Sequence, residues 1–162
     1  MMSSLCSVKD AISLIHKNVQ SLNRENVSIR ELPGRILRQS VIADRPLPPF
    51  DRVMMDGFAI KIRAWSDGLR KYLLCGRQMA CHEGAIVKSL HECVEVSTGA
   101  VLPSGSDLVI PLEWVSVVGR EVLIEPPADF SVDSGLFVHR KGSDFAKGDE
   151  LVSMGSSLNP GE

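Results

Sequence analysis

The most distinctive pattern in this chain is a carboxylate carried by a proline-rich segment. The segment reads Leu47-Pro48-Pro49-Phe50-Asp51-Arg52-Val53-Met54-Met55-Asp56-Gly57, and its prolines fix φ and disfavour helix in the residues ahead of them. We therefore expect an extended strap, defined here as Leu47 to Asp56. It would present the Asp56 carboxylate beside Gly57, where backbone and ligand can approach closely. The alternative is a plain hairpin turn, because Asp-Gly is a common turn signal.

Two later segments hold groups that suit anions. Thr98-Gly99-Ala100 offers a hydroxyl and approachable backbone N–H groups, which together would form a small anion-binding surface. A turn at the end of a strand would use the same glycine, so both interpretations of Thr98 stay open. Further on, Arg140 and Lys141 precede Asp144 and can balance negative charge. A solvated surface is the common alternative for such a basic pair.

The elements that must position these segments are short. Ser7 and Asp10 have the spacing of a helix capping box, and apolar residues at helical spacing predict a helix to about Val19. From Phe58 onward the apolar period is two, and Gly119-Arg120 predicts a hairpin turn. The strand candidates are 27–29, 41–42, 58–62, 72–74, 86–87, 93–96, 108–110, 114–118, 121–124 and 136–138.

This order of elements predicts a mostly β, α+β fold. Many short strands with glycine and proline between them are typical of a compact barrel or sandwich. We expect a small β-barrel-like domain over residues 46–144, inserted into an α/β linker domain made of residues 1–45 and 145–162. Asn159-Pro160 commonly opens a new element, so we also expect a fragment of a longer chain.

Composition and charge argue against several classes. The hydrophobic content of 44% and charged content of 23% are normal for a globular protein, and the net charge of −2 argues against binding to nucleic acid or anionic membrane. No apolar run approaches the roughly eighteen residues that a membrane span needs. The first residues lack the pattern of a secretory signal, so we expect a cytoplasmic, reduced location.

The cysteines raise one alternative site. Zinc accepts residues of the types found at Cys75, Cys81, His82, His91 and Cys93. Their spacing lacks a C-x2-C knuckle, and Cys93 stands in an alternating run where a buried small side chain is expected. We therefore favour free thiols over a zinc site.

Taken in order, these segments resemble the N-terminal half of the molybdopterin molybdotransferases, the MoeA and gephyrin E-domain family. The resemblance covers nearly the whole chain, and the order of its motifs is more specific than any one of them. The matching stretches are Gly34-Arg35-Ile36-Leu37, Leu47 to Asp51, Met55-Asp56-Gly57, Thr98 to Ile110, Arg140 to Asp149 and Leu158 to Glu162.

The resemblance implies a role in the last step of molybdenum cofactor assembly. Family enzymes insert molybdate into adenylylated molybdopterin and release AMP with help from a divalent cation such as Mg²⁺. They are elongated homodimers with the active site between subunits, and their pterin- and nucleotide-binding domain follows the point where this chain ends. This chain alone would supply one wall of the cleft and be inactive by itself.

The same resemblance implies roles for particular residues. Asp56 would order water, cation or oxyanion, and it is the candidate for a shared contact with Mg²⁺ or molybdate, while no complete metal site is expected within this chain. The residues implied in catalysis are Asp56, Thr98 and Asp144, and those implied in substrate or oxyanion binding are Gly57, Gly99, Arg140 and Lys141.

Several residues depart from the family pattern. Arg52-Val53-Met54 replaces the usual Asn-Ser-Ala, and Phe58 replaces the usual Tyr. Ser143 replaces the usual Glu, and Phe137 stands where many members have Asn. These changes leave open a divergent enzyme or a branch with weakened catalysis. A different class of function is a non-catalytic dimerisation or scaffolding module built on the same fold.

Overall fold

The computed structural model describes residues 6–82, 84–128 and 130–161. The chain divides into two compact units. We call Val41–Leu151 the sheet unit, and Met1–Ser40 with Val152–Glu162 the terminal unit. Every residue that the sequence singles out for chemistry lies in the sheet unit.

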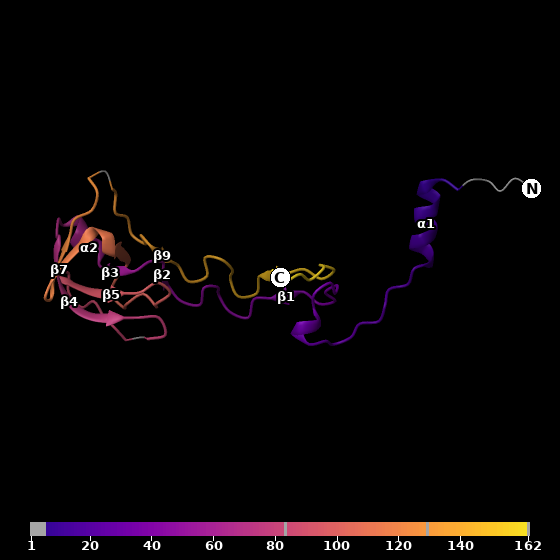
Figure 1. The fold of residues 1–162 in the computed structure, drawn as a ribbon, viewed down its shortest axis with the longest axis horizontal. Coiled ribbons are helices and arrows are strands. Elements are labelled where there is room, and N and C mark those ends of the chain that lie inside the picture. The colour runs from indigo at the N-terminus through magenta and orange to yellow at the C-terminus, as the bar shows by residue number, and fades with distance from the viewer. Residues whose placement is uncertain (1–5, 83, 129, 162) are drawn as a thin grey trace, which may run out of the picture. The chain divides into compact units, whose positions relative to one another are not determined.

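A six-stranded sheet, in the order β6-β3-β5-β4-β8-β7, builds most of the sheet unit and curls as a half-barrel (Figure 1). Strands β4 and β5 run parallel, whereas the other neighbouring pairs are antiparallel. The strands are β3 (Gly57–Ile60), β4 (Lys71–Gln78), β5 (Glu92–Val96), β6 (Leu108–Pro111), β7 (Val115–Val118) and β8 (Glu121–Ile124). The predicted mostly β, curled architecture is confirmed, whereas its insertion into an α/β linker stays a prediction.

The sheet strands β3 and β6 are buried on both faces. Along β3 the alternation of a strand sends Phe58 and Ile60 into one apolar core and Ala59 into another. The second core also takes in Val53 and Val138, which belong to the short antiparallel pair of β2 (Arg52–Val53) and β9 (Val138–His139). This pair anchors the strap and the segment around β9 to the body of the sheet.

The remaining elements are short. The β1–β10 pair forms a separate two-stranded sheet. The bounds are α1 (Val8–Asn18), η1 (Ile29–Glu31), β1 (Val41–Ile42), α2 (Ile62–Ser66), η2 (Leu112–Trp114) and β10 (Glu150–Val152). The predicted cap of α1 is confirmed, because the Ser7 hydroxyl oxygen accepts a hydrogen bond from the Asp10 N–H at 3.1 Å.

Three predicted strands need correction. The strand at 27–29 is wrong: Ile29 begins η1, and the Ser28 N–H donates to the Glu31 carboxylate at 3.1 Å, which favours a helical turn. Ile62 begins α2 instead of continuing a strand, because its N–H donates to the Asp107 carboxylate at 2.6 Å. Ile86 makes only an isolated bridge to Ser104.

Candidate functional site

The strap is the middle element that brings the three chemistry-bearing segments together. On one side Arg52 forms an antiparallel bridge with Val101, and on the other it pairs with His139 of β9. The Val53 N–H donates to the Ala100 carbonyl at 2.9 Å, so the strap is also hydrogen-bonded to the segment that carries Thr98. Segments far apart in the sequence are therefore adjacent at β2 and β9 (Figure 1).

The Asp56 carboxylate and Thr98 form a direct pair at the surface. Asp56 Oδ1 accepts hydrogen bonds from the Thr98 N–H at 2.7 Å and from the Thr98 hydroxyl at 2.9 Å. These two bonds, the backbone one first, lower the pKa of Asp56 below its ordinary value. Among the described residues no donor reaches Oδ2, and both side chains are exposed. The site therefore presents an ionised carboxylate with one oxygen fixed and one open to solvent.

The backbone N–H groups after this pair are already engaged within the chain. The Gly99 N–H donates to the Val53 carbonyl at 2.9 Å, and the Ala100 N–H donates to the Ser97 carbonyl at 3.0 Å. Gly99 has φ of +84°, a left-handed conformation that glycine adopts without strain. These bonds form a turn that holds Thr98 beside Asp56. An anion contact at Thr98-Gly99-Ala100 stays a prediction.

Gly57 has a packing reason of its own. It is buried in β3, and a Cβ atom built there would lie 2.0 Å from the Ile110 carbonyl oxygen of β6. No side chain fits at that distance, so glycine is required for the β3–β6 approach. A contact between Gly57 and a ligand stays a prediction.

Asp51, which is half-buried and lies five residues before Asp56 on the strap, is bound to the basic pair. Its carboxylate accepts from the Arg140 guanidinium at 2.7 Å and from the Lys141 N–H at 2.8 Å. Partial burial alone would raise the pKa of Asp51, but these hydrogen bonds and the nearby cations outweigh it and lower the pKa. Arg140 is thus committed to an internal carboxylate, whereas among the described residues the Lys141 ammonium makes no ion pair.

Asp144 lies on a second linkage across the strap. Its Oδ1 is 2.7 Å from His139 Nε2, and His139 Nδ1 is 2.9 Å from an Arg52 guanidinium nitrogen. The structure thus brings Asp56 and Thr98 together in one pair and places Asp144 in a separate linkage with His139 and Arg52.

Sequence reasoning missed Asp51 and His139 and noted Arg52 only as a departure from the family pattern. Asp51 stood in the strap as a second carboxylate, but the partner that explains it is 89 positions away. His139 precedes the basic pair and gives no signal of its own. Its pairing with Arg52 follows from the antiparallel register of β2 and β9, which the sequence does not reveal.

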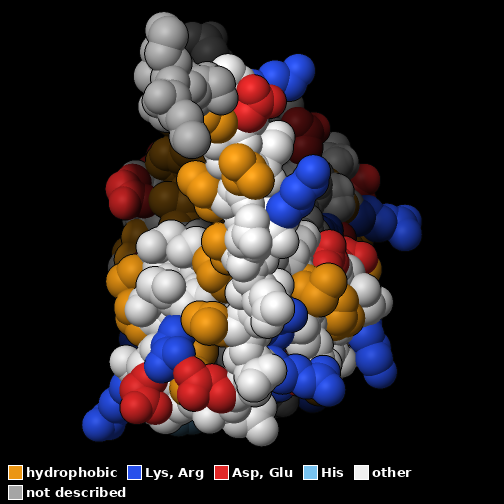
Figure 2. Space-filling view, turned by 90° about the vertical axis from the view of Figure 1, so that its right-hand side faces the viewer, with side chains coloured by type: hydrophobic (Ala, Val, Ile, Leu, Met, Phe, Trp, Pro, Cys, Tyr) orange, Lys and Arg blue, Asp and Glu red, His pale blue; other side chains and the backbone are white. Residues whose placement is uncertain are grey.

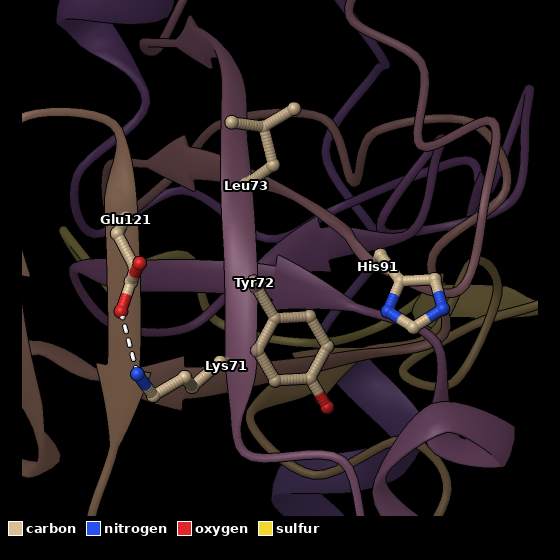
Figure 3. A pocket seen from close by; sticks show the side chains of 5 residues that line it. All are labelled: Lys71, Tyr72, Leu73, His91 and Glu121. Carbon is tan, nitrogen blue, oxygen red and sulfur yellow. Dashed lines mark hydrogen bonds and ion pairs between the residues drawn. The ribbon is translucent and has the colours of Figure 1, made fainter.

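A separate hollow of about 220 Å³ lies on another part of the sheet unit, lined by Lys71, Tyr72, Leu73, His91 and Glu121. Figure 3 shows these side chains, with the Lys71 ammonium paired to the Glu121 carboxylate at 2.9 Å. None of the predicted site residues lines it. Within the described ranges no three His, Cys, Asp or Glu side chains are grouped to hold a metal, and Cys93 lies in the apolar core.

No helix in the described part of the chain has the length and apolarity to cross a membrane. The family model described as the MoeA N-terminal region, domains I and II, matches residues 6–162. The chain is 36% identical over 155 residues to a molybdopterin molybdenumtransferase of Synechocystis, an alignment that covers 96% of this chain and 39% of that relative. It is 27% identical to gephyrin of Dictyostelium discoideum, over 98% of this chain and 24% of that protein.

Among solved structures, the molybdopterin biosynthesis MoeA protein of Pyrococcus horikoshii is similar, with a TM-score of 0.83 and 25% identity. That match covers 94% of this chain and 41% of the archaeal protein. In both comparisons the chain therefore spans well under half the length of its relative.

Proposed function

Because this chain belongs to the MoeA N-terminal family, we propose that it is the N-terminal part of an enzyme of molybdenum cofactor biosynthesis. The enzyme would insert molybdate into adenylylated molybdopterin and release AMP. The observation that carries the proposal is the exposed Asp56–Thr98 pair, which combines the first two motifs of the resemblance in one small site.

The geometry of Asp56 suits a reaction between anions. Cleavage of a phosphoanhydride requires the phosphates to be held, their charge to be offset and the attacking oxyanion to be placed nearby. Thr98 fixes one carboxylate oxygen of Asp56 and keeps the group ionised, so the free oxygen can orient a water or a cation. Thr98 acts on the reaction through Asp56.

Asp56 fits Mg²⁺ as a single ligand. Mg²⁺ keeps several waters and is usually held by one or two carboxylates together with substrate phosphates, and the exposed Oδ2 of Asp56 meets that requirement. When bound, Mg²⁺ would neutralise charge on the phosphates. Since the described residues contain no further grouped ligands, the rest of its shell would come from water, substrate and the domains that the longer relatives contain.

The two residues of the basic pair, Arg140 and Lys141, would have different roles. Arg140 is neutralised by Asp51 and holds the loop on the strap, whereas Lys141 has its ammonium free of ion pairs among the described residues and is the better candidate to meet an oxyanion. Asp144 would act from its position beside His139.

The test is molybdate-dependent release of AMP by a protein that carries this chain together with the remaining domains of its relatives. We expect turnover that requires molybdate and a divalent cation. The 162-residue chain alone should bind adenylylated molybdopterin poorly. No AMP release by the longer protein, or tight pterin binding by this chain alone, would contradict the proposal.

A dimerisation module is the second candidate, and α1 is the observation that favours it. The helix has no buried residue, and Ile12, Ile15 and Val19 are 49%, 60% and 67% exposed. Figure 2 shows one face of the molecule, on which hydrophobic side chains (orange) lie among charged and polar ones. An isolated helix of this length is marginal in water, so we propose that α1 packs in a homodimer. Light scattering should show a dimer that Ile12→Ser with Ile15→Ser converts to monomer, and catalytic inactivity with an intact dimer would favour the module.

A further inference from the structure

The strongest unassigned feature of the sheet unit is the linkage Arg52–His139–Asp144. Arg52 and His139 face each other directly in the antiparallel β2–β9 pair, while their neighbours Val53 and Val138 are buried on the opposite side. Burial of the valines fixes the backbone on both strands. The two polar side chains are thereby held at hydrogen-bonding distance on the outer face.

The chemistry of the three groups sets the tautomer of His139. A guanidinium has only donors, so the 2.9 Å contact requires Nδ1 of His139 to accept and to carry no proton. Nε2 must then carry the proton and donate to the Asp144 carboxylate at 2.7 Å. Only the neutral imidazole with its proton on Nε2 satisfies both partners.

Protonation changes the two bonds in opposite ways. When Nδ1 takes a proton from solvent, it uses the electron pair that accepted the Arg52 bond, and two cations then face each other. On the other side, the imidazolium forms an ion pair with Asp144. The remaining charged groups beside this linkage are Arg140, Lys141 and Asp51, which bind one another on the loop and the strap. The segment on the far side of β2, residues 99–102, carries no titratable side chain.

We propose that His139 is a proton-linked positioning residue of the strap. Neutral His139 holds Arg52 on one side and orients Asp144 on the other, whereas charged His139 keeps Asp144 and releases Arg52. Because the neutral and the protonated imidazole hold different partners, the linkage is sensitive to pH. Its consequence for turnover rests on the proposed function, because Asp144 and Asp56 matter only if the reaction uses them.

The test is made on the 162-residue chain without any activity assay. In ¹⁵N-detected NMR of the histidine rings at about pH 8, His139 should show a protonated Nε2 and an unprotonated Nδ1. On acidification, the amide signals of Arg52 and Val53 should shift with the same midpoint as the His139 ring. A neutral His139 with its proton on Nδ1 would overturn the proposal, and this measurement needs no variant.

Variants then separate the two bonds. Arg52→Met removes the group that opposes protonation and should raise the titration midpoint of His139 by about half a pH unit or more, whereas Asp144→Asn should lower it by a similar amount. His139→Gln should remove the pH response of the strap amides, and the matched control His91→Gln should leave it in place. A midpoint that Arg52→Met does not move, or a strap response that survives His139→Gln, would also overturn the proposal.

Failure of this linkage is distinguishable from failure of the proposed function. A longer protein that releases AMP but shows the wrong His139 tautomer would keep the function and lose the linkage. In an active protein, His139→Gln should lower turnover, because Asp144 loses the group that orients it, and should flatten the dependence of turnover on pH.

Discussion

Asp51 and Asp56 lie on the same strap, but the carboxylate of Asp51 is paired with a cation and that of Asp56 is not. Asp51 accepts from the Arg140 guanidinium and the Lys141 N–H, so its charge is offset inside the protein. Asp56 accepts only from the uncharged donors of Thr98, and its second oxygen reaches no donor among the described residues. Both carboxyls have a lowered pKa, but only Asp56 keeps a negative charge that a ligand can use.

The difference shows why a lowered pKa alone does not identify a site. At Asp51 burial opposes the lowering of the pKa, which comes first from the Lys141 backbone N–H and then from the Arg140 guanidinium, and both partners hold a loop to the strap. At Asp56 the lowering reflects orientation by a hydroxyl and an N–H at the surface, which leaves the negative charge unpaired. We therefore expect substitution at Asp51 to change stability and substitution at Asp56 to change chemistry.

The largest expected effect is that of Asp56→Asn on turnover. The amide oxygen can still accept from Thr98, so the fold and its resistance to unfolding should be unchanged. Loss of the negative charge should reduce molybdate-dependent AMP release by about 100-fold or more in a protein that carries the remaining domains. Near-normal turnover would mean that the charge of Asp56 has no part in the reaction and that its role does not differ from that of Asp51 in the way proposed.

Asp51→Asn should have the complementary result. Loss of the charge that holds Arg140 should destabilise the sheet unit by about 1–2 kcal/mol, less than the roughly 1.5–3 kcal/mol of a buried hydrogen bond to a charged group because both side chains are partly exposed. Because the folded pKa of Asp51 is lowered, its stabilisation is present above the ordinary value of 3.8 and is lost as pH falls through the folded pKa. Urea unfolding should therefore show a larger gap between the original and variant proteins at pH 7 than at pH 3. A gap that is constant with pH would refute the assignment.

The structural features that the sequence alone predicts correctly are local ones. The Ser7 cap of α1 and the hairpin at Gly119-Arg120 depend on residues close in the chain, and both are confirmed, the latter by the Val118–Glu121 pairing. The pairing of Asp56 with Thr98 could be anticipated only through the order of motifs in the resemblance, because the two residues are 42 positions apart.

The contacts that could not be predicted from the sequence depend on the register of strands that are far apart in the chain. The parallel β4–β5 pair and the β2–β9 pair join distant segments, and no local pattern specifies which residues face each other. For the same reason, the pairing of Asp51 with Arg140 could not be predicted. The end of the strand at Ile62 could not be predicted either. There the carboxylate of Asp107, distant in the sequence, accepts a hydrogen bond from the first N–H of α2, and a helix begins.

Thr98→Val tests how much the Thr98 hydroxyl contributes to holding the Asp56 carboxylate. The variant loses the hydroxyl donor and keeps the backbone N–H, which is the larger cause of the lowered pKa. The pKa of Asp56 should rise part of the way toward 3.8, and turnover should fall by about fivefold. Carboxyl ¹³C NMR measures the pKa, and Thr98→Ser, which keeps a hydroxyl, should restore both values. A restored pKa without restored turnover would point to a direct contact between the Thr98 methyl group and the substrate.

The smallest expected effect is that of Gly99→Ala, and it decides whether this glycine serves the fold or a ligand. Apart from its chain neighbours, no atom of the described residues lies within 4 Å of a Cβ built at Gly99, so the cost should come only from the left-handed backbone at φ of +84°, about 1 kcal/mol. Since the Gly99 N–H already donates to the strap, turnover measured below the unfolding temperature should be nearly unchanged. A large loss of turnover with this small loss of stability would mean that a ligand occupies the open space beside Gly99. In that case the turn, and not Asp56 alone, would contribute to binding.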